Sequence, residues 1–291
     1  MGILLKLLAR LPLRWLHRLG ALLGWLVYFA SPRYAARLRE NLERSGVCAD
    51  AAARRLLRQT IAEAGKGAAE LPAVWLKPQD EALSLMRRVN GWEHVEAALA
   101  RGKGIIFLTP HLGCFEIASL YYAAHHPITV LYRPPRLSCL QPLLECGRQR
   151  GQVTLAPTDL SGVKALLKAL KRGEAAGILP DQTPGKGEGV WARFFGRPAY
   201  TMTLAARLAR SSGATVILAY AERLARGEGY ALWLEPLDGE WPTEPVEAAG
   251  FLNRAIEDLI RKLPAQYLWS YNRYKIPRGA EPPPADLTGV P

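Results

Sequence analysis

The sequence predicts one α/β domain built on a mostly parallel sheet, and three observations indicate it. Short apolar runs without alternation, such as IIFLT at 105–109, are typical of strands that are covered on both faces. Helix-like stretches lie between most of these runs, as in a layered sheet with crossover helices. At 291 residues the chain is also long enough to bury one large core.

Apolar runs and helical periodicity place the elements in order along the chain. A helical lead-in is expected at 33–72, ending at Pro72, and a further helical stretch at 91–104. The expected strands are 105–109, 128–132, 152–156, 175–179, 215–221 and 230–237. The expected helices among and after them are 115–124, 136–150, 161–172, 201–211 and 247–263. The chain therefore divides into an N-terminal appendage at 1–32, a domain at 33–279 and a Pro-rich tail at 280–291, which we expect to be disordered.

The N-terminal appendage has the pattern of a surface that faces a membrane. Residues 1–39 contain seven basic side chains and no acidic one, and Lys6, Arg10, Arg14 and Arg18 recur every four residues. On a helix this spacing forms one basic stripe beside apolar faces. The uncharged stretch that follows, at 19–30, has twelve residues, whereas a membrane-spanning helix needs about 20. We therefore predict a membrane-anchoring helix at 1–32.

How this segment meets the membrane stays open at the level of sequence. It could lie in the interface, or it could span with help from residues 11–16 and snorkelling arginines. A buried core helix with a basic face is a further alternative. A cleaved signal peptide fits poorly, because Trp25, Tyr28 and Phe29 stand where small residues should precede a cleavage site.

The formal charge of +12 indicates a polyanionic partner. Nucleic acid, an anionic membrane surface and an acidic carrier protein are all polyanions. A nucleic-acid-binding protein needs basic residues and stacking aromatics on its folded body, but here the densest basic cluster flanks an apolar segment. We therefore expect no nucleic acid partner.

Neither a metal site nor a disulfide framework is indicated. His125 and His126 are adjacent, so their side chains diverge, and no third ligand is evident. The four cysteines have no C-x-x-C pair, so we expect reduced thiols. Cys114 lies inside the motif described next, as a small buried thiol or, alternatively, as a nucleophile.

The chemistry is predicted at the end of the first strand, where TPHLGCFE places His111 directly after a buried run and Glu116 five residues later. On one continuous helix this step rotates by about 500°, so the pair works only if His111 lies in a turn and Glu116 in the first helical turn. Ligands of open α/β sheets bind at this edge. His111 could then accept a proton from a hydroxyl while a carboxylate fixes its tautomer. The alternative is a helix-capping histidine with a glutamate that the helix dipole favours.

Four ordered blocks carry a family resemblance: HLGCFE, LYRPPR at 131–136, ILPDQTPGKGEGVWARFFGRPAYT at 178–201 and LPAQYLWSYNRYKIPRG at 263–279. Together they resemble the lipid A late acyltransferases, a branch of the glycerolipid acyltransferase superfamily. The resemblance implies a membrane-anchored αβα domain at the cytoplasmic face of the inner membrane, with no cofactor. It also implies acyl carrier protein as the donor and a hydroxyl of a lipid A precursor as the acceptor.

The resemblance further implies roles for single residues. His111 would be the base and Glu116 its partner, while Arg133, Asp181 and Gln182 match the second and third blocks. A guanidinium after the 128–132 strand suits a phosphate or an oxyanion, although Arg133 could be a surface residue. Asp181 could hold Arg133, orient the acceptor sugar or only form a turn.

Charged and apolar residues alternate further along the third block. Lys186, Arg193 and Arg197 surround Phe194 and Phe195, which suits a lipid phosphate bordered by an acyl chain, or alternatively a solvated loop. No serine or cysteine has the setting of a nucleophile and no G-x-S-x-G elbow is present, so we expect direct transfer without an acyl-enzyme. A phospholipid, a glycosylated inositol lipid or an aminoacyl lipid stays open as the acceptor.

Overall fold

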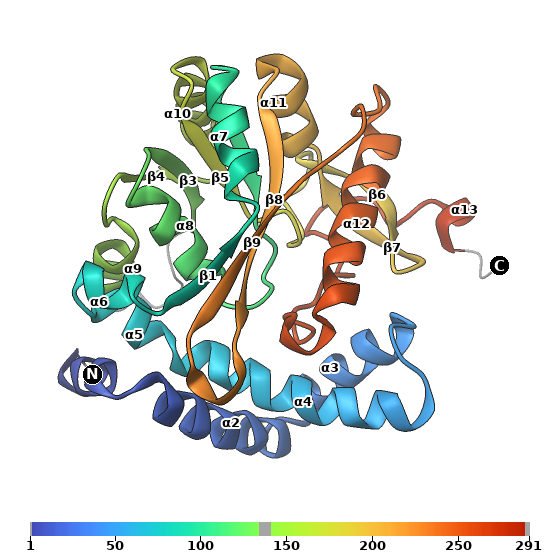
Figure 1. The fold of residues 1–291 in the computed structure, drawn as a ribbon. Helices are drawn as coiled ribbons and strands as arrows, with labels where there is room; N and C mark the ends of the chain where they lie inside the picture. The colour runs from blue at the N-terminus through green and yellow to red at the C-terminus, as the bar shows by residue number, and fades with distance from the viewer. Residues whose placement is uncertain (1, 134–140, 289–291) are drawn as a thin grey trace.

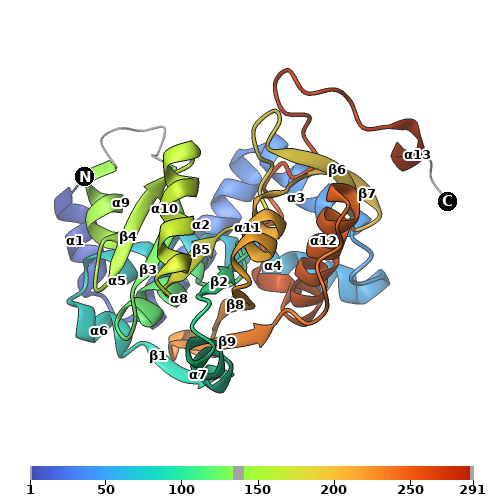
Figure 2. The same cartoon turned by 90° about the horizontal axis from the view of Figure 1, so that it is seen from above.

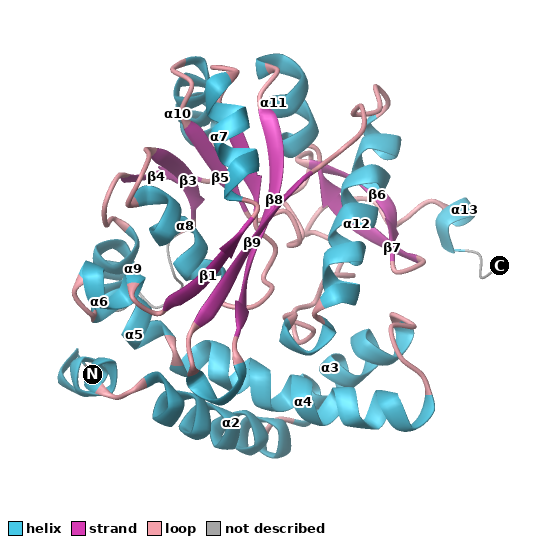
Figure 3. Ribbon diagram, viewed as in Figure 1, coloured by secondary structure: helices cyan, strands magenta, loops and turns pink. Residues whose placement is uncertain are grey.

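The computed structural model describes residues 2–133 and 141–288, which form a seven-stranded sheet between layers of helices (Figures 1 and 3). The strand order is β1-β9-β8-β2-β5-β3-β4. All neighbouring strands are parallel except β8 and β9, which confirms the mostly parallel sheet. The strands are β1 (Met86–Asn90), β2 (Ile105–Leu108), β3 (Ile128–Tyr132), β4 (Val153–Pro157), β5 (Ala175–Ile178), β8 (Thr215–Arg223) and β9 (Tyr230–Pro236).

The central strand β2 is buried on both faces, as its unbroken apolar run predicted. Ile105 and Phe107 join the core that contains α7 (Trp92–Ala100) and α8 (Phe115–Ala123). Ile106 and Leu108 point to the opposite core. That second core contains α10 (Leu160–Lys171), α11 (Leu204–Ser212) and α12 (Pro245–Lys262), and Figure 2 shows the helices on the two sides of the sheet.

Three strands were not expected from the sequence. Strand β1 carries two exposed arginines at the edge of the sheet, so it lacks an apolar run. Strands β6 (Gly189–Phe194) and β7 (Arg197–Met202) form an antiparallel hairpin beside α12. The helix expected at 201–211 therefore begins only at Leu204. The one expected at 136–150 is described as α9 (Gln141–Arg148), and residues 134–140 lie outside the described part.

The helical lead-in consists of α3 (Pro32–Arg44), α4 (Asp50–Ala69), α5 (Leu71–Leu76) and α6 (Gln79–Leu83). The expectation that it ends at Pro72 was wrong. Pro72 lies in the first turn of α5, where a missing backbone N–H removes no helical hydrogen bond.

The N-terminal segment forms α1 (Gly2–Arg10) and α2 (Leu13–Ala30), and α2 is packed on the domain. Its buried residues Leu13, Leu16, His17, Gly20 and Gly24 form one face, and α2 and α4 run side by side (Figure 1). The two helices cross at glycines: a Cβ placed on Gly65 of α4 would lie 1.9 Å from the carbonyl oxygen of Gly20.

The other face of this segment is apolar and exposed. Nine of the twelve large apolar side chains that the described residues expose belong to α1 and α2: Leu4, Leu7, Trp15, Leu19, Leu22, Leu23, Leu26, Val27 and Phe29. None of the helices in the described ranges has both the length and the apolar character needed to cross a membrane.

The start of the Pro-rich tail contacts the hairpin. The indole Nε1 of Trp191 donates to the carbonyl of Glu281 (3.1 Å), and Arg193 donates to the carbonyl of Asp286 (3.2 Å). A short helix, α13 (Ala285–Thr288), ends the described chain. The expected disorder of residues 280–291 stays a prediction.

Candidate active site

The pairing of β2 with β5 brings His111 and Asp181 together. Leu108 and Ile178 are paired in the parallel register, and each strand then leaves the sheet at its carboxyl end. His111 and Asp181 each lie three residues beyond these partners. Two parallel neighbours therefore present the imidazole and the carboxylate at the same edge of the sheet.

Asp181 holds His111 through two hydrogen bonds. The imidazole Nδ1 lies 2.8 Å from Oδ1 of Asp181, and the backbone N–H of His111 donates to Oδ2 at 3.0 Å. Burial alone would raise the pKa of Asp181, but the interactions with His111 outweigh it, so the pKa is lowered from its ordinary value. An ionised Asp181 accepts a hydrogen bond from the Nδ1–H group of His111.

The second nitrogen of His111 meets the side chain of Gln182, whose amide nitrogen Nε2 lies 3.0 Å from the imidazole Nε2. An amide nitrogen can only donate, so the imidazole Nε2 accepts in this contact. With the proton on Nδ1, the lone pair on Nε2 is available to a hydroxyl that replaces the Gln182 amide. This is the tautomer that a general base requires.

Glu116 lies in the first turn of α8 as expected, but its partner is Arg148 of α9. The guanidinium Nε donates to both carboxylate oxygens (3.1 and 2.9 Å), and Nη2 binds Oε1. Trp75 of α5 donates its indole N–H to Oε2 (3.2 Å). Within the described part of the chain, no hydrogen bond or ion pair joins Glu116 to His111. The expected partner of the histidine is thus replaced by Asp181, because the turn before α8 directs Glu116 toward α5 and α9.

Arg148 and Trp75 are the residues that sequence reasoning missed. Arg148 stood in an expected helix, but nothing in the spacing linked it to Glu116. The contact depends on Gly147, where a Cβ would lie 2.5 Å from Cβ of Trp75, so α9 packs closely on α5. Burial lowers the pKa of Arg148, but the charge of Glu116 more than compensates, and the net pKa is raised.

An apolar cavity adjoins these residues and holds about 750 Å³ of space between atoms, including its open mouth. Phe115 lines it and lies 4.7 Å from the imidazole of His111, ring centre to ring centre. Glu116 and Arg148 are the only charged residues among its described lining, and they neutralise each other. The rest is mainly apolar and aromatic, including Trp92, Phe107, Tyr122, Ile128, Val130, Leu155, Ile178 and Leu179.

The other expected residues do not contact His111. Arg133 is exposed, and its Nε lies 3.5 Å from the hydroxyl of Thr158, so Asp181 does not hold it. Lys186 is exposed in the turn after Gln182. Arg197 binds Glu40 of α3 (3.1 Å) and lies 3.8 Å over the ring of Tyr274. A role for these three cations in binding remains a prediction.

Cys114 is buried, with 2% of its surface exposed. Burial, together with the charge of nearby Glu70, raises its pKa well above the ordinary value. A thiol held in this state is a poor nucleophile, which supports the reading of Cys114 as a core residue.

Fold and site together define an α/β protein that holds a histidine–carboxylate pair next to an apolar cavity. The model of the bacterial lipid A biosynthesis acyltransferases matches residues 1–276. The chain belongs to this family.

Individual relatives are similar over most of their length. The chain is 29% identical to the lipid A biosynthesis lauroyltransferase of Escherichia coli K12, over 93% of this chain and 89% of the relative. It is 27% identical to the palmitoleoyltransferase of the same organism, over 93% and 88%. A phosphatidylinositol mannoside acyltransferase of Mycobacterium tuberculosis is 26% identical, over 72% and 74%.

Proposed function

We propose that this chain transfers a fatty acyl group from an acyl carrier protein thioester to a hydroxyl of a lipid A precursor. The observation that carries the proposal is the Asp181–His111 pair, whose imidazole packs against Phe115 in the lining of the apolar cavity. Secondary acylation in lipid A biosynthesis is also the activity that the names of the relatives suggest.

His111 is the general base. Its Nε2 takes the proton of the acceptor hydroxyl as the oxygen attacks the thioester carbonyl, and Asp181 stabilises the imidazolium that forms. The carbon–sulfur bond then breaks, and the departing thiolate takes the proton back from His111. No acyl-enzyme forms in this sequence, in keeping with the buried, protonated thiol of Cys114.

Arg148 stabilises the negative charge that develops on the carbonyl oxygen. Glu116 engages its Nε and Nη2, which orients the guanidinium and leaves Nη1 for another acceptor. In this mechanism Glu116 positions Arg148 rather than His111. The role differs from the one that the family resemblance suggested for Glu116, although the residue is the same.

The cavity beside Phe115 takes the acyl chain of the donor. Its apolar lining suits a hydrocarbon, and its charged pair marks the place where the thioester would stand. A net charge of +12 favours an acidic carrier protein as the bearer of that chain.

The exposed face of α1 and α2 lies on the cytoplasmic face of the inner membrane. Its nine apolar side chains and the basic residues beside them suit the interface of an anionic bilayer. The guanidinium of Arg18 lies 4.8 Å from the ring of Trp15, and such a pair of a cation and an aromatic ring suits the boundary between lipid headgroups and acyl chains. The acceptor lipid thus stays in its own membrane during transfer.

The test uses the full chain in mixed micelles with lauroyl-acyl carrier protein and a lipid A precursor without secondary chains. Mass spectrometry should detect a precursor heavier by one acyl group. His111→Ala should abolish the transfer, whereas the matched variant His125→Ala, at an exposed histidine on another turn, should retain it.

Two outcomes would separate parts of the proposal. Transfer to a mannosylated inositol lipid but not to the lipid A precursor would replace the acceptor and keep the mechanism, an alternative motivated by the mycobacterial relative. A burst of acylated protein on mixing with the donor alone would refute direct transfer.

A further inference from the structure

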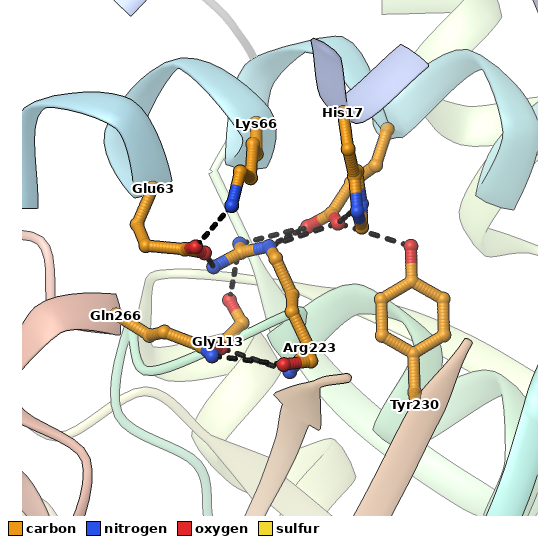
Figure 4. A network of polar contacts seen from close by, with 8 residues as sticks. His17, Glu63, Lys66, Gly113, Arg223, Tyr230 and Gln266 are labelled. Carbon is orange, nitrogen blue, oxygen red and sulfur yellow. Dashed lines mark hydrogen bonds and ion pairs between the residues drawn. The ribbon is translucent and has the colours of Figure 1, made fainter. Parts of the chain in front are cut away.

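A buried polar network joins the N-terminal helix to the turn that carries His111 (Figure 4). At its centre is Glu70, which follows α4 and is 1% exposed. Its carboxylate accepts hydrogen bonds from Nε of Arg223 (2.9 Å to each oxygen) and from the hydroxyl of Tyr230 (3.0 Å). The imidazole Nε2 of His17 lies 3.1 Å from Oε2. Four elements, α2, α4, β8 and β9, therefore meet at one carboxylate.

The charges of this network compensate each other. Burial would raise the pKa of Glu70, but the charge of Arg223 and hydrogen bonds from His17 and Arg223 lower it to about 2. Burial would lower the pKa of Arg223, yet Glu70 raises it on balance. Both groups are therefore charged at neutral pH, and the opposite charge of each compensates for the cost of burying the other.

Arg223 also holds the active-site turn. Its Nη2 donates to the carbonyl of Gly113 at 2.8 Å. The side chain of Gln266, in the short 3₁₀ helix η3 (Pro264–Gln266), binds the backbone N–H and carbonyl of Arg223 (2.8 and 3.0 Å). The N–H of Gly113 donates in turn to the backbone carbonyl of Gln266 (3.1 Å). Both polar backbone groups of Gly113 are thus held from outside the turn.

Gly113 is a position where the backbone has little freedom to move. Its φ is +63°, and a Cβ there would lie 2.0 Å from the carbonyl oxygen of Ala221 on β8. It stands two residues after His111 and three before Glu116. A shift of its carbonyl therefore moves the proposed base and the carboxylate that orients Arg148 at the same time.

We propose that Arg223 and Glu70 are positioning residues for acyl transfer, and that His17 makes α2 part of the same support. The inference rests on the proposed function only for its kinetic readout. The ion pair fixes the Gly113 carbonyl, the carbonyl fixes the turn, and the turn sets the direction in which His111 and Glu116 face. The helix expected as a membrane anchor thereby becomes part of the support of the active site.

Two variants test the positioning role. Arg223→Lys keeps the buried charge, but a single ammonium cannot bind the Glu70 carboxylate and the Gly113 carbonyl with the geometry of a planar fork. Glu70→Gln/Arg223→Met removes both charges together and keeps an acceptor for His17 and Tyr230, so no unpaired ion is left buried. The matched control is Arg210→Lys, because Arg210, at an exposed position of α11, also binds backbone carbonyls, those of Pro242 and Thr243.

Kinetics and melting temperature are measured together. We expect kcat to fall by about 10- to 100-fold in both Arg223 variants, because misplacement of reacting groups has effects of this size. KM for the acyl donor should change by less than about 3-fold, and melting temperatures should not follow the order of activity. Arg210→Lys should keep the wild-type kcat. If both Arg223 variants remain folded and keep kcat within about 2-fold, the positioning role is refuted.

A second measurement separates this inference from the proposed function. Hydrogen exchange at the amides of 111–116 should become about 10-fold faster or more in the Arg223 variants, and should be unchanged in Arg210→Lys. If the wild-type chain shows no transferase activity and exchange is still faster in the Arg223 variants, then Arg223 and Glu70 hold the 111–116 turn, but the proposed function is refuted. Unchanged exchange would overturn the positioning role whatever the activity.

Discussion

At the scale of single residues, Asp181 determines which ring nitrogen of His111 carries the proton. The carboxylate accepts from Nδ1, so the lone pair on Nε2 faces the side where Gln182 now binds. The same arrangement explains why a buried Asp181 can stay ionised. One side chain thus sets both the tautomer and the local charge.

Asp181→Asn should disable the base without disturbing the fold. An asparagine amide can donate to Nδ1 and leave the proton on Nε2, which is the wrong tautomer for abstraction. We expect kcat to fall by about 10⁴-fold, as for carboxylate-to-amide changes beside a catalytic histidine. The control is Asp159→Asn, where either residue can cap α10. Similar steady-state rates for Asp181→Asn and the wild type would exclude the pair from catalysis.

The space in the cavity beside Gly177 should limit how long an acyl chain the protein can bind. Gly177 of β5 lines it, and a Cβ there would lie 3.1 Å from Cγ2 of Val130. Gly177→Val should lower kcat/KM for long donors more than for short ones, by about 10- to 200-fold per methylene excluded. Ala176→Val adds a similar volume on the opposite face of the same strand and should leave the preference unchanged. A uniform loss for all donors would mean that the chain binds elsewhere.

The sequence could identify His111 and Glu116 because a turn and the helix after it are local. It could not identify which carboxylate contacts the imidazole, since Asp181 is 70 residues away and depends on the β2–β5 register. Arg148 was missed for a similar reason: its contact requires α9 to approach α5 at Gly147. Local spacing located the motif, whereas strand pairing decided the partners.

At the scale of elements, α2 has two faces of different character. One face fits against α4 through glycines, and the other carries seven of the twelve large apolar side chains that the described residues expose. The sequence pattern predicted one helix with a basic stripe over 1–32, whereas the structure divides the segment into α1 and α2, with the break at Leu11 and Pro12. The pattern left open whether a buried face exists, because Gly20 and Gly24 carry no side chain from which a packing partner could be inferred.

Gly65→Ala should separate α2 from α4. The added methyl group meets backbone atoms of Gly20 and Gly24, which cannot rotate away. We expect the free energy of unfolding to fall by about 1–3 kcal/mol. Gly250→Ala is the matched control, because this helical glycine of α12 has only the end of the Arg254 side chain near its Cβ. Since alanine favours helix, the control should gain up to about 1 kcal/mol in urea denaturation.

The exposed face of α2 should determine lipid association. Leu22→Glu/Leu26→Glu places two charges on side chains that are 69% and 61% exposed, so the fold should be unaffected. Flotation with vesicles that contain anionic phospholipid should show much weaker binding. Val246→Glu changes another exposed apolar residue, on α12, and should bind as the wild type does. Equal flotation of both variants would place the lipid contact on a different surface.

Among the elements of the sheet, those with continuous apolar runs were predicted well. Strand β1 escaped prediction because an edge strand can expose arginines, and the β6–β7 hairpin because its sequence mixes charge with aromatic residues. Strand β1 lies at the edge of the seven-stranded sheet and the hairpin forms a separate two-stranded sheet, whereas burial on two faces leaves the clearest pattern at the centre of the large sheet.

At the scale of the whole molecule, the Glu70–Arg223 pair makes stability depend on pH. The pKa of Glu70 is about 2 in the folded chain, below its ordinary value of 4.5. A lowered pKa stabilises the fold fully above the unfolded value, and the contribution is lost as the pH falls toward the folded value. The window for this carboxylate is therefore about pH 4.5 down to about pH 2.

Glu70→Gln should be less stable than the wild type at neutral pH, because it leaves the buried Arg223 with only the more distant carboxylate of Glu63, at 3.6 Å. The difference in free energy of unfolding should be constant above about pH 5 and shrink below about pH 4.5, as the wild type loses the ionised carboxylate. Urea titrations of both proteins over this range measure it. A difference that does not change with pH would mean that Glu70 titrates normally in the folded chain.

The packing of α2 on α4 also determines how the exposed apolar surface of the protein can be reduced. Deleting residues 1–32 would remove His17 from Glu70 and would uncover the face of α4 around Ile61. The exposed apolar face of α2 would thus be replaced by the newly exposed face of α4. Polar substitutions at the outward leucines of α2 keep the helix in place and change only what meets the solvent. Variants for crystallisation should therefore carry substitutions on the exposed face of this helix rather than a deletion of the helix.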